Sequence, residues 1–373
     1  MEKRRYKNSN DYISLLGFGC MRLPQTAEKK IDEKAAEEMV DAAMNAGVNY
    51  FDTAYIYHNG ESEKFLGRAL KKYRRESFYL ADKMPPWNVR KAADVERIFE
   101  EQLRRCGVEY FDFYLIHNAS RETIPTIEKY DFYDFLKLKK EEGKIRRLGF
   151  SAHDRASFLK SYTEKYEFDF AQIQLNYLDW EQQDAEGQYN VLAEKGLPVI
   201  VMEPLRGGAL ARLNKNALDI LKAADSEASA ASWGLRYAAS KPAVLTVLSG
   251  MSEIGQLTDN IHTFKNFRPL DEDEYRVLEG ALKEFRASRP VPCTACRYCS
   301  DCPAGVDIAR NFGVYNAYLA EKSAFAFESG YALIDETNRA HLCIECGKCM
   351  EHCPQKIKIP EILKKVAALD KRK

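Results

Sequence analysis

The chain has 373 residues, enough for one large domain and one small one. Its hydrophobic content of 45% and charged content of 30% are typical of a globular protein, and 56 basic side chains balance 56 acidic ones. That balance argues against a nucleic acid or an anionic membrane as partner. No apolar stretch follows the basic start, as a secretory signal would require, and no run approaches the length of a membrane span. We therefore expect a cytoplasmic protein with no membrane partner.

Short apolar segments alternate with amphipathic helical patterns from about Ile13 to about Phe267. The helical patterns include Glu33–Ala46, Val95–Cys106 and Ile127–Glu142. The predicted strands are Leu15–Leu23, Val48–Thr53, Phe78–Lys83, Phe111–His117, Arg147–Ala152, Phe170–Tyr177, Pro198–Glu203 and Leu245–Ser249. Eight strands with helical partners over roughly 250 residues predict an α/β protein with a closed (β/α)₈ TIM barrel. The alternative, a doubly wound open sheet, usually carries GxGxxG after its first strand, whereas this chain has GFGCMRLP.

One more helix, with an acidic first turn, is predicted over Asp271–Arg286. The composition then changes sharply at Ser288–Pro292. We place the domain boundary there, with a barrel over residues 1–287 and a small domain over residues 288–373. That small domain contains eight of the ten cysteines. The two isolated ones, Cys20 and Cys106, are predicted to be packed in the core.

The eight clustered cysteines form two runs. In a reducing compartment such clusters bind metal more often than they form disulfides. Two-residue spacers let successive thiolates surround one [4Fe–4S] cluster, and a fourth cysteine followed by proline reaches the other cluster in two-cluster ferredoxins. The predicted ligands are therefore Cys293, Cys296, Cys299 and Cys353 for one cluster, and Cys343, Cys346, Cys349 and Cys302 for the second.

Two alternatives remain at the cysteine runs. The first run is one residue shorter before its fourth cysteine than the bacterial pattern, so local ligation within each run stays open. Zinc also accepts four thiolates, commonly from two CxxC pairs, but triple two-residue spacing followed by Cys-Pro is more typical of clusters. A helical pattern around Ile308–Lys322, between the runs, predicts a mainly helical, ferredoxin-like domain.

Three successive predicted strands end in an ionisable residue, namely Asp52, Lys83 and His117, and Tyr57 follows Asp52 closely. Barrel enzymes build their active sites at these strand ends. Each residue alone has an ordinary structural role, such as a helix cap, but the four together indicate catalysis. Reducing a carbonyl by hydride transfer leaves an alkoxide that needs a proton. A tyrosine can give it if a nearby ammonium, held by a carboxylate, lowers the tyrosine pKa, while a neutral histidine orients the carbonyl.

These residues, with the segment FDTAYIY, resemble the Asp-Tyr-Lys-His tetrad of the aldo-keto reductases, and the resemblance covers about residues 13–270. It implies that Tyr57 is the general acid, that Lys83 and Asp52 tune it, and that His117 orients the carbonyl. The whole chain, including VMEPLRGG and LSGM, is similar to a bacterial subgroup of that family with a C-terminal ferredoxin-like extension.

The same resemblance implies a nicotinamide nucleotide site. Its residues would be Ser151 and Gln172 at the carboxamide, Leu205, Arg206 and Gly207 at the pyrophosphate, and Ser249, Gly250, Gln256 and Asn260 towards the adenosine. Ala152 replaces the family's usual asparagine and Met202 its stacking aromatic residue, and Met251–Asp259 lacks a basic residue for the 2′-phosphate of NADP. NADH is therefore favoured slightly over NADPH. Serines and glycines after strands also form turns and helix caps, which is the purely structural alternative.

The leading hypothesis is an oxidoreductase that reduces a small-molecule carbonyl, or oxidises the alcohol, with a nicotinamide cofactor. Its clusters would relay electrons, with a redox protein as partner, or would stabilise a domain. The alternative is an iron–sulfur electron-transfer protein or reductase with a repurposed barrel and flavin in place of nicotinamide, although no flavin motif is present. A third hypothesis is a scaffold protein with structural clusters, but the presence of the tetrad argues against it.

Overall fold

The computed structural model describes residues 1–288, 290–321 and 323–370. The chain divides into two compact units, of which the first comprises Met1–Pro204 and Gly234–Leu270 and the second Leu205–Trp233 and Asp271–Lys373. The domain boundary predicted at residue 288 rests on composition and stays a prediction, and Arg289 within it lies outside the described residues. Among the described residues, no helix combines the length and apolar character needed to cross a membrane.

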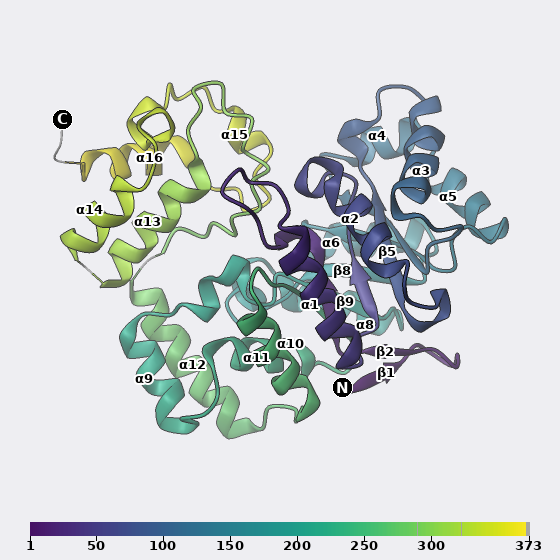
Figure 1. Ribbon diagram of the computed structural model, residues 1–373, viewed down its shortest axis with the longest axis horizontal. Helices are drawn as coiled ribbons and strands as arrows, with labels where there is room; N and C mark the ends of the chain where they lie inside the picture. Colours follow the sequence, from purple (N-terminus) through teal and green to yellow (C-terminus); the bar gives the residue numbers. More distant parts are fainter. Residues whose placement is uncertain (289, 322, 371–373) are drawn as a thin grey trace. The chain divides into compact units, whose positions relative to one another are not determined.

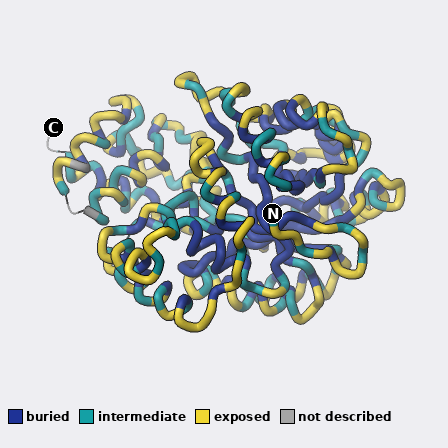
Figure 2. Tube along the Cα trace, turned by 60° about the horizontal axis from the view of Figure 1, so that its bottom comes forward, coloured by how far each residue is buried: buried dark blue, intermediate teal, exposed yellow. Residues whose placement is uncertain are grey.

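The first unit is built on a closed barrel of parallel strands (Figure 1). Its strands pair in the order β10-β3-β4-β5-β6-β7-β8-β9. They are β3 (Leu16–Gly19), β4 (Tyr50–Asp52), β5 (Tyr79–Met84), β6 (Phe113–Ala119), β7 (Leu148–Ala152), β8 (Phe170–Gln174), β9 (Val199–Met202) and β10 (Val244–Gly250). Each overlaps one predicted strand, so the predicted (β/α)₈ barrel is confirmed. The strands are almost entirely buried, as the dark blue core of Figure 2 shows.

Helices alternate with these strands because apolar side chains recur along one face of each amphipathic segment. They are α1 (Glu33–Asn45), α2 (Glu61–Leu70), α3 (Ala93–Cys106), α4 (Ile124–Lys129), α5 (Phe132–Glu141), α6 (Ala156–Lys165), α7 (Asp179–Gln182), α8 (Ala185–Glu194), α10 (Ala230–Ala239) and α11 (Ile254–Lys265). The single helix predicted over Ile127–Glu142 is wrong, because α4 and α5 are separate. Asp131 between them has a φ of 51°, a left-handed conformation that interrupts a right-handed helix.

An antiparallel hairpin, β1 (Lys3–Arg5) with β2 (Tyr12–Ser14), precedes the barrel and was not predicted. Tyr6 and Ile13 in this segment are buried with side chains of the barrel strands, and the Tyr6 ring lies edge-on to Phe113 at 6.0 Å. The hairpin therefore contributes to the core of the barrel.

The second unit begins with the 3-10 segment η5 (Arg206–Ala211) and α9 (Lys215–Ala224), which packs against α12 (Glu272–Ala287). The predicted acidic first turn of α12 is capped by Asp271, whose carboxylate accepts from the Glu274 backbone N–H at 2.9 Å. The cysteine-rich part contains α13 (Ile308–Glu321), α14 (Ala324–Ala332), α15 (Lys348–Glu351) and α16 (Ile359–Ala368), which confirms its mainly helical character. Lys322, the predicted end of α13, lies outside the described residues. Phe312, Tyr331 and Val366 are fully buried in the hydrophobic core of this cysteine-rich part.

Candidate functional site

The structure brings the four predicted tetrad residues to one rim of the barrel. Asp52 ends β4, Lys83 and His117 lie near the carboxyl ends of β5 and β6, and Tyr57 opens the 3-10 turn Tyr57–Gly60 after β4. Asp52, Lys83 and His117 are 3%, 1% and 4% exposed, which is unusual for ionisable side chains.

Lys83 is the centre of this group. Its Nζ donates to Asp52 Oδ1 at 2.6 Å and to the Thr53 carbonyl oxygen at 2.7 Å. The same Nζ lies 5.1 Å from the centroid of the Tyr57 ring. The Tyr57 ring in turn stands nearly perpendicular to the His117 imidazole, with centroids 6.4 Å apart. The four side chains therefore form one contiguous group.

Burial raises the pKa of Tyr57 well above its usual 10, and the Asp52 carboxylate adds to the effect while Arg22 opposes it. This differs from the predicted lowering by Lys83. The reason is that Tyr57 is deeply buried, and the cost of placing a phenolate there outweighs the effect of the nearby charges. Tyr57 therefore keeps its hydroxyl proton at neutral pH.

Burial also lowers the pKa of His117 well below 6.5, assisted by the charge of Lys83 and by His153. The pKa of His153 falls to about 4, again because of burial, although the Glu203 carboxylate opposes it. Both imidazoles are thus neutral at physiological pH. A neutral His117 can donate an N–H to a substrate oxygen without adding a second cation beside Lys83.

This neutrality gives the first testable expectation. Between pH 8 and pH 6, neither His117 nor His153 should take up a proton, because both pKa values lie below that range, whereas the unfolded chain would titrate near 6.5. NMR titration of ¹³C-labelled histidine, with signals assigned by His117→Gln and His153→Gln, measures this directly. A midpoint above pH 6 for either ring would contradict the assignment.

Further side chains around the tetrad were not predicted. Arg22 and Glu203 form an ion pair at 2.8 Å, and they shift the pKa of Tyr57 in opposite directions. His153 lies near enough to affect His117, and the Trp87 ring lies 4.8 Å from the His117 ring. These four additional residues each lie within three positions after the end of a barrel strand. That position just after a strand is the sequence signal that could have identified them.

Ser151 and Gln172 lie opposite each other on β7 and β8 and are both buried. The Ser151 hydroxyl accepts from the Asn118 backbone N–H at 2.8 Å. The Gln172 side-chain amide nitrogen lies 3.6 Å from Met202 Sδ, while its buried amide oxygen has no hydrogen-bond partner among the described residues. A carboxamide N–H₂ is the kind of donor that such an oxygen requires, so this position fits the predicted nicotinamide.

The remaining predicted nucleotide residues fall into three groups. Ser249, at the end of β10 beside Gly250, accepts from Asn260 Nδ2 at 2.9 Å, so these residues are brought together. Gln256 is engaged locally, accepting from the Ser252 backbone N–H. Leu205, Arg206 and Gly207 begin the second unit, where Arg206 is buried.

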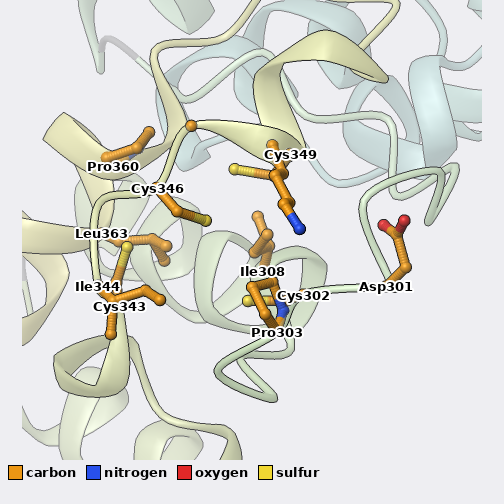
Figure 3. Close-up of a pocket in the computed structure, with 12 residues that line it drawn as sticks. Asp301, Cys302, Pro303, Ile308, Cys343, Ile344, Cys346, Cys349, Pro360 and Leu363 are labelled. Atoms are coloured by element: carbon orange, nitrogen blue, oxygen red, sulfur yellow. The ribbon is translucent and has the colours of Figure 1, made fainter.

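The eight clustered cysteines line two cavities, each surrounding space not filled by protein atoms. The first cavity is lined by Cys293, Cys296, Cys299 and Cys353 among others. The second is lined by Cys302, Cys343, Cys346 and Cys349 among others, and Figure 3 shows these four side chains around it. Each cavity thus takes three cysteines from one run and the fourth from the other.

The chemistry of these cavities fits iron–sulfur clusters. Burial, followed by the neighbouring cysteines of the same cavity, raises the pKa of Cys299 to about 12 and that of Cys349 to about 11. Four thiolates would repel one another there unless metal neutralised them. Among the described residues, no three His, Cys, Asp or Glu side chains are arranged to hold a single metal ion. The sulfurs instead surround a space, as they do around a cluster.

Comparison with known proteins supports both the barrel and the iron–sulfur domain. The sequence profile of the aldo/keto reductase family matches residues 15–283, and that of the 4Fe-4S dicluster domain matches residues 292–357. The uncharacterized oxidoreductase YqkF of Bacillus subtilis is 29% identical over 323 residues, covering 78% of this chain and all of YqkF. L-galactose dehydrogenase of Arabidopsis thaliana is 26% identical, covering 75% of this chain and 93% of its own.

A solved structure has the same barrel. The aldo-keto reductase AKR11C1 from Bacillus halodurans, in its holo form, is 27% identical with a TM-score of 0.63, and the match covers 75% of this chain and 96% of that one. The family profile spans well over half of the sequence. The chain therefore belongs to the aldo/keto reductase family and carries a C-terminal 4Fe-4S dicluster domain.

Proposed function

We propose that the barrel reduces a small-molecule carbonyl, or oxidises the corresponding alcohol, with Tyr57 as the proton donor. A bound nicotinamide would supply the hydride. Tyr57 then gives its hydroxyl proton to the oxygen that becomes negatively charged, and His117 holds that oxygen by donating from its neutral ring. Asp52 holds the Lys83 ammonium beside the Tyr57 ring, so both residues act through Tyr57.

The observation that carries this proposal is the buried ion pair of Lys83 and Asp52 against Tyr57. Removing two charges from water costs several kcal/mol per ion before their attraction is counted, and packed apolar residues would be at least as stable. Such a pair at the carboxyl ends of barrel strands therefore favours a catalytic role over a structural one.

The proposed cofactors are a nicotinamide nucleotide and two [4Fe–4S] clusters. The nucleotide would be held by the nine predicted residues, with the free amide oxygen of Gln172 receiving the carboxamide. The clusters would be bound by the cysteines of each cavity and would relay electrons to a redox protein or stabilise the domain.

Met202 beside Gln172, where a stacking aromatic residue is usual, favours a second candidate, an iron–sulfur reductase that uses flavin. The two candidate functions differ in how electrons reach the substrate. Hydride transfer from nicotinamide moves two electrons at once, whereas an iron–sulfur cluster normally passes one. The protein should be reconstituted anaerobically, analysed for flavin, and mixed with NADH or NADPH. Reduction of a carbonyl without bleaching of the clusters or bound flavin supports the first proposal. Flavin-dependent bleaching supports the second.

Cofactor preference gives a further expectation. The segment Met251–Asp259 contains no lysine or arginine, so a 2′-phosphate would lack charge-assisted hydrogen bonds of roughly 1.5–3 kcal/mol each. NADH should therefore bind at least as tightly as NADPH. Competitive titration decides this, and NADPH binding about 100-fold tighter would mean that a basic residue from elsewhere grips the phosphate.

A further inference from the structure

The segment after β9, Leu205–Ala211, contacts the wall of the first cysteine cavity. The Arg206 side chain is 2% exposed, and its Nη2 donates to Gln355 Oε1 at 3.2 Å. Gln355 follows Cys353 and Pro354 and lines the first cavity together with Cys353. A buried guanidinium needs such acceptors, so this contact fixes the start of the segment.

The next residue makes a backbone contact with the same wall. Gly207 has a φ of +64°, and a Cβ built on it would lie 2.1 Å from the Thr294 carbonyl oxygen and 2.8 Å from its Cα. Only glycine allows so close an approach. Thr294 follows Cys293 and also lines the first cavity. Residues 206 and 207 thus touch both polypeptide segments that bring Cys293 and Cys353 to that cavity.

The second cavity has no such connection. Its lining comes from residues 301–303, 308, 343–349, 360 and 363 of the described chain, and Leu205–Ala211 contributes none of it. The two cavities, each lined by four cysteines, therefore differ in their relation to this segment. That difference provides a control within the same molecule.

We propose that the cluster bound by Cys293, Cys296, Cys299 and Cys353 organises the Leu205–Ala211 segment and thereby sets nucleotide affinity, whereas the other cluster does not. The affinity part rests on the proposed function, in which Leu205, Arg206 and Gly207 line the pyrophosphate. Without metal, the four thiols of the first cavity are no longer held together, so the backbone at Thr294 and Gln355 becomes more mobile. The contacts that Arg206 and Gly207 make with these two residues then weaken. Because coupling between two sites is reciprocal, bound nucleotide should in turn protect this cluster.

Hydrogen exchange of the full-length, anaerobically reconstituted protein tests the structural part. Cys353→Ala and Cys346→Ala each remove one sulfur, from the first and second cavity respectively. Exchange of the amides of Leu205–Ala211 should accelerate about tenfold in Cys353→Ala, equivalent to about 1.4 kcal/mol of lost protection. It should remain as in the wild type in Cys346→Ala. Equal acceleration in both variants, or in neither, would overturn the proposal.

A second pair of variants keeps all eight cysteines. Gln355→Leu removes one acceptor of Arg206, and Lys348→Met alters the lining of the second cavity. With iron content unchanged in both, Gln355→Leu should accelerate exchange of the segment and weaken NADH or NADPH binding about tenfold, and Lys348→Met should do neither. Nucleotide should also slow iron loss to a chelator from the first cavity in the wild type and in Lys348→Met, but not in Gln355→Leu.

The outcomes separate the two proposals. If the wild type binds neither nucleotide, the nicotinamide function fails, and the exchange measurements still decide whether the first cluster organises the segment. If nucleotide binds with equal affinity to the wild type and Gln355→Leu, and exchange is unchanged, the coupling is refuted while the proposed function stands.

Discussion

Tyr57→Phe is expected to lower carbonyl reduction about 100-fold or more, the usual loss when a general acid is removed. The substitution deletes only the hydroxyl. The ring that lies 5.1 Å from Lys83 Nζ and edge-on to His117 stays, so the buried charge pair keeps its surroundings. Steady-state turnover of an aldehyde with NADH or NADPH measures the loss, and nucleotide titration should give nearly wild-type affinity.

Tyr55→Phe is the matched control. This neighbouring tyrosine donates to Glu101 Oε2 at 3.0 Å and takes no part in the tetrad, so its loss should leave turnover almost unchanged. Turnover of Tyr57→Phe close to that of Tyr55→Phe, with any carbonyl substrate that the wild type reduces, would mean that another group supplies the proton.

Cys353→Ala is expected to abolish the cluster of the first cavity, and Cys302→Ala that of the second, because each residue joins three cysteines of the other run. Each variant should lose about half of the iron, since each cluster depends on four thiolates. The domain has a small core and gains folding free energy from its metal. In Cys353→Ala, whose cavity is lined by residues directly after the 288–292 boundary, protease should therefore also cut near that boundary while the barrel stays folded. Electron paramagnetic resonance of the reduced variants distinguishes the two clusters.

Cys106→Ala is the control, because it removes a thiol that is not a predicted cluster ligand. Cys106 is buried beside Asp82 and lines neither cavity, so its removal should leave both clusters and all of the iron in place. If Cys353→Ala spares the cluster held by Cys293 and abolishes that held by Cys343, ligation is local to each run. The crossed assignment would then be incorrect despite the lining of the cavities.

The barrel was predictable because its signals are local. A buried parallel strand is a short apolar run, and an ionisable residue marks its end at Asp52 and lies close to its end at His117. The hairpin was missed because its first strand, Lys3–Arg5, is entirely basic and shows no alternation of apolar and polar residues. The break between α4 and α5 was missed because Asp131 carries no breaker signal as strong as glycine or proline.

The sequence by itself determined the eight barrel strands, the positions of the four predicted tetrad residues near strand ends, and the iron–sulfur domain, because spacing along a strand or a CxxC run restricts geometry over a few residues. The tertiary structure alone decided the direction of the Tyr57 pKa shift, since that depends on burial and on how Lys83 and Asp52 share charge. It also decided which cysteines line the same cavity. The bond from Arg206 to Gln355 joins positions 149 residues apart, and no local pattern encodes such a contact, because it forms only when separate segments pack together.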